Sequence, residues 1–155
     1  MSEPLKVDLR KFRNKIYRVD LEFDGIDHSG ASYEGRIFVN NPHADYDTEK
    51  KSEAGYVGSL YIFGHGGCFG DMGHCDIQTE RRPYDFRSAH QLTPIKKRLT
   101  ITEAVFKRIK NKEKLIVTIV PILPKGMMMT NIKHPEDVIK LESISLIMYD
   151  SPSKR

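Results

Sequence analysis

Residues 16–23 alternate between apolar and charged side chains, and this period of two most constrains the fold of the chain. The apolar members are Tyr17, Val19, Leu21 and Phe23, and the charged members are Arg18, Asp20 and Glu22. Successive side chains of a β-strand point to opposite faces. The pattern therefore predicts a strand with one buried face and one solvated face.

Five further segments have the composition of strands: residues 33–39, 56–63, 97–101, 114–120 and 143–149. Segment 56–63 is apolar on both faces, which favours a central or covered strand. Thr102 is expected to cap one short helix over residues 103–109. Six or more strands with a single short helix predict an all-β protein, and we expect an antiparallel β-sandwich of six to eight strands.

The length of 155 residues is typical of one domain. We expect an N-terminal extension over residues 1–15, a sandwich over residues 16–150 and a frayed tail over residues 151–155. No run of 18 apolar residues is present, so no membrane span is expected. The first residues carry acids and bases where a secretory signal needs an apolar stretch, which predicts a cytoplasmic, reducing location and leaves export with a partner open.

A long loop over residues 64–95 interrupts the strand pattern. Its first twelve residues contain five glycines, which disfavour regular structure because glycine loses the most backbone entropy on ordering. Loops of this length inside a small domain are either functional or disordered. The histidine and cysteine content of this Gly-rich loop favours function.

The loop contains a candidate metal site made of His65, Cys68, His74 and Cys75, with His90 as a further ligand. Thiolate and imidazole donors suit zinc or copper, so either metal is a candidate cofactor. The spacing differs from that of a zinc finger, because no Cys-x-x-Cys pair is present. Two other readings stay open, namely a disulfide in an exported protein and thiols with no special role.

The net charge of +4 is unevenly distributed along the chain. Residues 1–77 carry nine basic against thirteen acidic side chains, and residues 78–155 carry sixteen against eight. The basic residues are scattered, and no aromatic-rich RNA-binding motif accompanies them. We therefore expect no specific nucleic-acid partner.

No catalytic residue is assigned. No amphipathic helix follows the glycines of residues 64–67, so a nucleotide-binding loop is not expected. Cys68 with one of the histidines is only a weak indication of a hydrolase, because such pairs are defined by their geometry and not by spacing. We expect no catalytic activity from this chain itself.

Several segments together resemble a known family. Residues 18–21, Arg-Val-Asp-Leu, resemble the Lys-Phe-Asp-Val motif of the C-terminal domain of plant polyphenol oxidases. Residues 54–59 and 63–65 resemble that domain's aromatic-x-Gly-Ser strand, which runs to a histidine. Residues 93–103 and 115–121 are similar to its Thr-Glu turn and its Val-Thr-Leu-Val-Pro strand. The likeness spans residues 16–149.

Residues 63–76 are also similar to a Gly-, His- and Cys-containing segment in the C-terminal regions of bacterial tyrosinase-like proteins. The resemblance implies a β-sandwich that packs over a type-3 dicopper domain and shields its entrance. Fungal relatives use a Cys-x-x-Cys pair in copper delivery, a spacing that Cys68 and Cys75 do not match.

The dicopper domain itself is missing from this chain. A type-3 centre needs six histidines, mostly on a four-helix bundle, whereas the six histidines here are expected in loops. The resemblance thus implies a non-catalytic accessory domain whose partner is a type-3 copper oxidase catalytic domain. The alternative is an independent copper- or zinc-binding protein that uses the histidines and cysteines of the loop.

Overall fold

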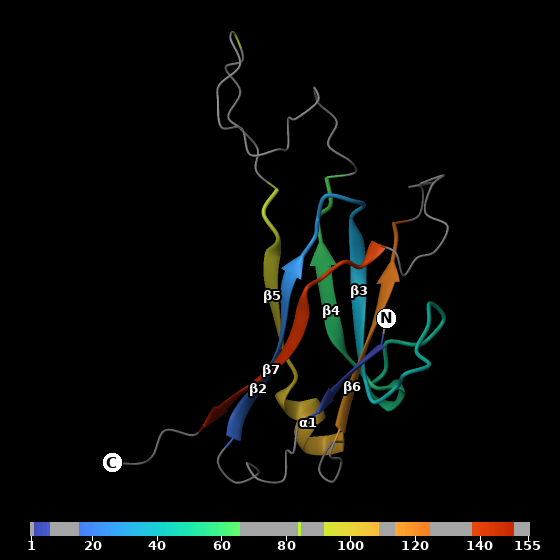
Figure 1. Ribbon diagram of the computed structural model, residues 1–155. Coiled ribbons are helices and arrows are strands. Elements are labelled where there is room, and N and C mark those ends of the chain that lie inside the picture. Colours follow the sequence, from blue (N-terminus) through green and yellow to red (C-terminus); the bar gives the residue numbers. More distant parts are fainter. Residues whose placement is uncertain are drawn as a thin grey trace.

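The computed structural model describes residues 2–6, 16–65, 84, 92–108, 114–124 and 138–150. In this part of the chain seven strands form two antiparallel sheets that face each other (Figure 1). Sheet A has the order β1 (Ser2–Lys6), β6 (Lys114–Ile122), β3 (Tyr33–Val39), β4 (Tyr56–Ile62). Sheet B has the order β5 (Ile95–Thr100), β2 (Ile16–Ile26), β7 (Ser143–Asp150). The expected antiparallel β-sandwich is confirmed.

The core lies between the inner faces of the two sheets. Strand β2 supplies Leu21 and Phe23, and sheet A supplies Ile37, Leu115 and Val117, all of them fully buried. Burying each such side chain stabilises the fold by about 1.5–3 kcal/mol. The alternation thus places Val19, Leu21 and Phe23 in the core as expected. Tyr17, the first residue of the predicted buried set, is instead 54% exposed, and the pairing of β2 with β7 is irregular between Ile16 and Arg18.

Two strands differ from expectation. Residues Ser2–Lys6, expected to belong to an N-terminal extension, form edge strand β1, in which Pro4 lies opposite Ile116 of β6. Proline is tolerated there because an edge strand has one unpaired side. Strand β4 was expected to be central or covered, but it is the edge strand of sheet A, and its Tyr61 is 61% exposed.

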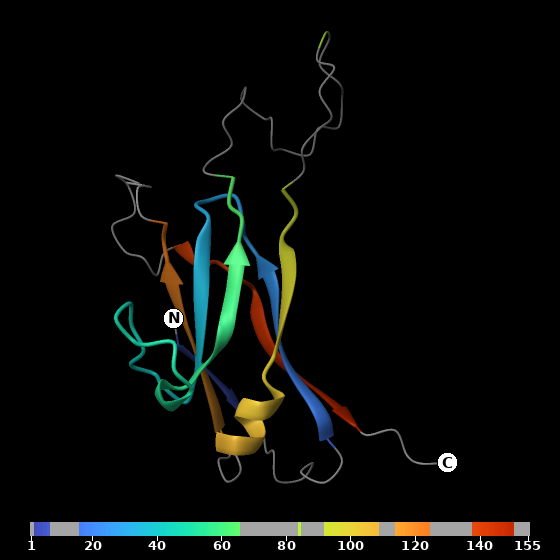
Figure 2. The ribbon, with the colours of Figure 1, turned by 180° about the vertical axis from the view of Figure 1, so that it is seen from behind.

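One helix, α1 (Thr102–Arg108), follows β5 and lies at one end of the sandwich (Figure 2). Thr102 was expected to precede and cap the helix, but it is the first helical residue. Its hydroxyl accepts a hydrogen bond from the backbone N–H of Val19 at 2.9 Å, which joins the helix to β2. No helix in the described residues has the length and hydropathy needed to cross a membrane.

Asp20 is fully buried although it lies on the outer face of sheet B. The guanidinium of Arg18 contacts both carboxylate oxygens: Nε donates to Oδ1 at 2.9 Å, and Nη2 lies 2.8 Å from Oδ2. The same guanidinium lies 5.3 Å from the centre of the Tyr149 ring, a cation–π contact. The hydrogen bond from Arg18 is the main reason that the pKa of Asp20 lies below its usual value, despite burial.

The part of this face that β2 and β5 form also carries charged pairs. Glu22 pairs with Arg98 and with Lys96, whose Nζ lies 3.1 Å from its carboxylate, and Lys96 also lies 3.0 Å from Asp24. The pKa of Glu22 is lowered mainly by its hydrogen bond from Arg98. These pairs link β2 to the edge strand β5 on the outside of sheet B.

We expect Asp20→Asn to reduce the free energy of unfolding by about 1–3 kcal/mol at pH 7, because a buried charge-assisted pair is lost. The folded-state pKa of Asp20 is depressed, so its contribution is complete above the unfolded pKa of about 4 and is lost as the pH falls. The stability difference between the two proteins should therefore narrow from pH 7 to pH 3. Urea unfolding over this range measures it.

The matched control is Asp47→Asn, the same chemical change at an exposed position in the loop between β3 and β4. Its urea midpoint should equal that of the wild type at every pH. An equal effect of both variants would contradict the role given to Asp20.

Candidate functional site

The structure describes one of the five predicted metal ligands. His65 follows β4 and is exposed. Cys68, His74, Cys75 and His90 lie outside the described residues, as does most of the Gly-rich loop. The predicted site over residues 65–75 therefore stays a prediction. Within the described ranges, no three histidine, cysteine, aspartate or glutamate side chains gather as metal ligands.

The chain just after β4 is held against the connection between β2 and β3. The backbone N–H of Gly64 donates to Oγ of Ser32 at 3.0 Å, and the N–H of His65 donates to the carbonyl of His28 at 3.0 Å. A Cβ atom on Gly64 would lie 2.1 Å from the carbonyl oxygen of Gly30, so only glycine allows this close approach. The position of His65 is thereby fixed by the sandwich.

This contact brings the rings of His28 and His65 together. Their centroids are 5.1 Å apart in a T-shaped arrangement with an interplanar angle of 69°. Nε2 of His28 lies 2.9 Å from the carbonyl oxygen of Thr93, just before β5. His28 was not among the predicted site residues, because it lies 37 positions before His65 in the sequence.

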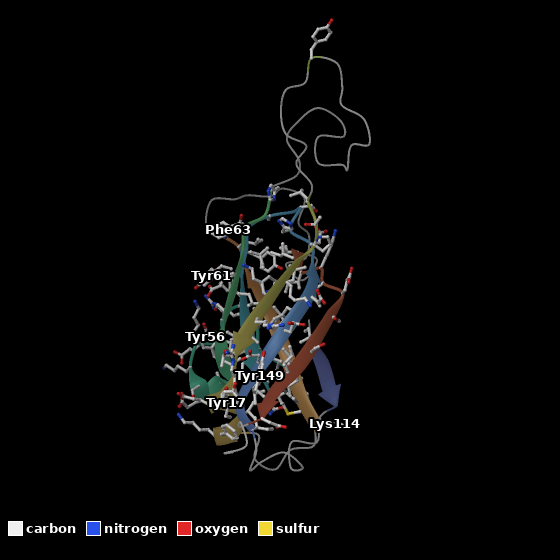
Figure 3. The ribbon with its side chains drawn as sticks, turned by 90° about the vertical axis from the view of Figure 1, so that its left-hand side faces the viewer. Tyr17, Tyr56, Tyr61, Phe63, Lys114 and Tyr149 are labelled. Carbon is white, nitrogen blue, oxygen red and sulfur yellow. The ribbon has the colours of Figure 1, made fainter. Side chains whose placement is uncertain are left out.

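An aromatic stripe runs along β4 on the outer side of sheet A. It consists of Tyr56 and Tyr61 of β4 and of Phe63, the residue after the strand (Figure 3). Tyr61 and Phe63 are 61% and 81% exposed, whereas Tyr56 is half-buried and makes an edge contact with Phe38 at 5.7 Å. The stripe ends two residues before His65 in the sequence.

The polar partner of this stripe is Glu34 on β3. Its Oε1 accepts hydrogen bonds from Ser59 at 2.7 Å and from the hydroxyl of Tyr61 at 3.5 Å, and it also pairs with Lys50. Partial burial raises the pKa of Glu34, but the hydrogen bonds from Lys50 and Ser59 outweigh this and keep the pKa below its usual value. The ionised carboxylate of Glu34 thus lies among the hydroxyl groups of this side of β4.

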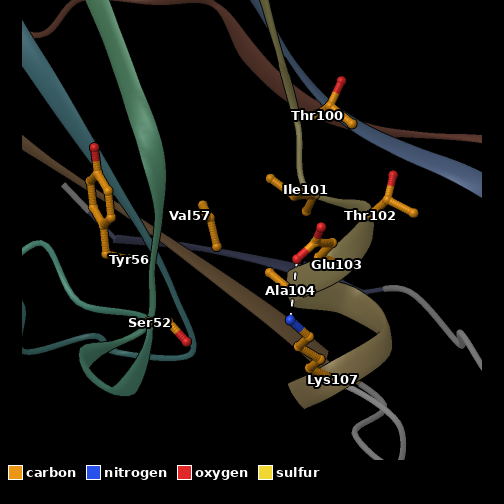
Figure 4. Close-up of a pocket in the computed structure, with 9 residues that line it drawn as sticks. All are labelled: Ser52, Tyr56, Val57, Thr100, Ile101, Thr102, Glu103, Ala104 and Lys107. Carbon is orange, nitrogen blue, oxygen red and sulfur yellow. Dashed lines mark hydrogen bonds and ion pairs between the residues drawn. The ribbon is translucent and has the colours of Figure 1, made fainter.

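A pocket of about 540 Å³ lies at the opposite end of the sandwich, between the short 3₁₀-helix η2 (Ser52–Ala54), the start of β4 and α1 (Figure 4). Its lining includes Tyr56, Thr100 and the Glu103–Lys107 ion pair, in which Nζ lies 3.2 Å from the carboxylate. None of the predicted site residues lines this pocket.

Comparisons with known proteins support the fold but not a family assignment. No protein-family model matches the chain, and no curated protein matches it. Among solved structures it is similar to latent aurone synthase, a polyphenol oxidase from natural source, with a TM-score of 0.54 and 15% sequence identity. The chain thus shares the fold of one part of that structure.

The match covers 99% of this chain and 25% of that polyphenol oxidase, so the chain spans about a quarter of the length of its relative. This share agrees with the expected resemblance to a C-terminal domain of polyphenol oxidases. At this level of identity the likeness concerns the fold and not the activity.

We expect Gly64→Ala to lower the free energy of unfolding by about 1–3 kcal/mol, because the added methyl group collides with the backbone of residues 30 and 31. The matched control is Gly30→Ala on the other side of the same contact, where a Cβ atom would meet nothing within 4 Å. Urea unfolding of both variants is the measurement. Equal midpoints for the two variants would contradict the close approach at Gly64.

Proposed function

We propose that this chain is a non-catalytic accessory domain that docks on a type-3 copper oxidase domain and shields its entrance. The observation that carries the proposal is the pair of exposed aromatic side chains, Tyr61 and Phe63, at the end of a strand in a polyphenol oxidase-like sandwich. The proposal assigns the oxidation chemistry to the partner, because a dicopper centre needs six histidines that lie mostly on a four-helix bundle, whereas the six histidines of this chain are expected in loops.

The aromatic stripe has the character of an interaction surface. Tyrosine and phenylalanine are enriched in the cores of protein–protein interfaces, where they bury a large area at a small cost in side-chain entropy. Phe63 is the more exposed of the two and makes no polar contact through its ring, so burying it against a partner gains the most.

The outer face of sheet B is a less suitable docking surface. Its charged side chains already pair with one another across β2 and β5. Covering these pairs would remove water from them without providing new partners, which is unfavourable. We therefore place the contact on the β4 side of the sandwich.

Steric exclusion is the mechanism of shielding in this proposal. Phe63 is the residue after β4, and its backbone precedes Gly64, whose N–H is bound to Ser32. Because the backbone next to it is held in place, the apolar ring of Phe63 can cover the mouth of a substrate channel in the partner. It then excludes phenolic substrates and water. Removal of the domain would then activate the oxidase.

The test is a binding titration of the wild-type chain against a purified type-3 copper oxidase domain from the same cell, with diphenol oxidation as a second readout. We expect a stable complex and a lower oxidation rate in it. Phe63→Ser should weaken binding at least about tenfold, because an interface aromatic is replaced by a small polar side chain. Tyr61→Ser should weaken it in the same direction.

Tyr17→Ser is the matched control, since Tyr17 is 54% exposed but lies on sheet B. It should bind the oxidase like the wild type. Failure of the wild-type chain to bind any such oxidase domain would overturn the proposal. So would binding that Tyr17→Ser weakens and Phe63→Ser leaves unchanged, because the contact would then lie on sheet B.

A further inference from the structure

Strand β7 is an edge strand without the features that keep the other edge strands from pairing with further chains. We propose that its free edge pairs with β7 of a second copy of this chain, which joins the B sheets of the two copies into one continuous antiparallel sheet. This proposal concerns association of the chain with itself and does not depend on docking to an oxidase.

Strand β7 is paired along one side in the part of the chain that the structure describes. Sheet B has the order β5, β2, β7, so β7 bonds to β2, and its other side bonds to no described strand (Figure 3). Its register with β2 is regular from the pair Arg18–Tyr149 to the pair Asp24–Ser143. The N–H and C=O groups of the free side therefore form a row that can bond to a further strand.

The other edge strands of the two described sheets carry features that hinder such pairing. Strand β5 has three consecutive basic residues, Lys96–Arg98, and β1 contains Pro4. The register of β4 with β3 shifts between Ile37 and Phe38. Strand β7 has no charged residue, proline or glycine over residues 143–149. Because charges, prolines and bulges protect edge strands from pairing with other chains, β7 is the unprotected edge.

The apolar side chains of β7 gain burial from an added strand. Leu146 and Met148 pack against the core but are only half-buried. Ile147 lies on the outer face opposite Asp20, and it and Tyr149 are half-buried as well. An added strand covers these apolar groups and bonds to the free backbone groups at the same time, which is the source of affinity in strand addition.

The sequence of β7 is self-complementary about a two-fold axis through Ile147. In an antiparallel pair, residues equally far from this axis lie opposite each other, so Leu146 faces Met148 and Ser145 faces Tyr149 of the second copy. Ile147 faces itself. A β-branched pair at the centre and a small side chain opposite a large one pack well across two strands.

Charge selects this axis over the neighbouring one. An axis through Leu146 would place Asp150 opposite Glu142 of the second copy, and like charges directly opposite each other destabilise a pair of strands. With the axis through Ile147, Asp150 faces Ile144 instead, and Glu142 lies beyond the end of β7. The favoured pairing thus uses residues 144–150 of each copy.

The association closes at two copies. The joined sheet begins and ends with β5, whose basic residues disfavour pairing with a further chain. A two-fold contact also uses the same surface on both copies, so no free β7 edge remains. The surface proposed for the oxidase is on β4, which contacts β5, whereas β7 contacts β1. The two interactions therefore use opposite sides of the sandwich.

The experiment is sedimentation equilibrium of the untagged full chain in the presence of a reductant, which prevents disulfides between copies. We expect a reversible dimer with a dissociation constant of roughly 1–100 µM, because two single strands form a small interface. Ile147→Lys should weaken the dimer at least about tenfold, since it places two lysines opposite each other at the axis. A wild-type chain that stays monomeric up to about 1 mM would overturn the proposal.

A charge exchange separates loss of the contact from loss of the fold. Ile147→Glu should also be monomeric by itself, but its equimolar mixture with Ile147→Lys should form a heterodimer, because opposite charges then meet at the axis. A variant that fails to fold cannot regain binding in this way. Absence of the heterodimer, although both variants unfold cooperatively in urea, would contradict the proposal.

Ser143→Lys is the matched control, since Ser143 is an exposed residue of the same strand but lies outside the pairing over residues 144–150. It should dimerise like the wild type, and so should Phe63→Ser. A dimer that Ile147→Lys leaves unchanged would place the contact elsewhere and overturn the proposal. So would a monomeric wild-type chain whose binding to the oxidase domain is lost in Ile147→Lys, because β7 would then pair with the oxidase.

Discussion

The two-point contact between Arg18 and Asp20 acts together with the apolar side chains of β2 to fix which face of this strand points inward. Strand β2 is the middle strand of sheet B and pairs with both β5 and β7. A shift of its register by one residue would bring Asp20 into the core and expose Leu21 and Phe23. A carboxylate without its guanidinium is costly in an apolar core, so the pair excludes the wrong register as well as stabilising the correct one.

The strands that follow a hydrophobic pattern could be predicted from the sequence. The alternation of residues 16–23 indicates a strand, and in the structure this strand continues to Ile26. The pairing of β2 with β5 is irregular between Phe23 and Ile26, and Ile26 is buried. Strand β1 could not be predicted in this way, because a short segment containing Pro4 has neither alternation nor β-branched residues. Its position depends on pairing with β6, which is more than a hundred residues away in the sequence.

The candidate site was only partly predictable for a similar reason. His65 can be predicted as a candidate site residue from the sequence, because glycines and cysteines surround it. His28 can be found only from the directions of the strands. β2 and β4 belong to different sheets but point toward the same end of the sandwich (Figure 1), so the residues that follow these two strands meet there. Tyr61 was expected to be covered, since an apolar segment does not by itself distinguish an edge strand from a central one.

The contacts of His28 have a consequence for the variation that this fold tolerates. Its carbonyl binds the N–H of His65, and its ring contacts the carbonyl of Thr93, so one residue holds the chain at both ends of the connection between β4 and β5. With the two ends anchored, doubling the length of the connection would cost only about 0.6 kcal/mol in closure entropy. The connection between β4 and β5 can therefore vary in length and sequence while the fold of the sandwich stays the same.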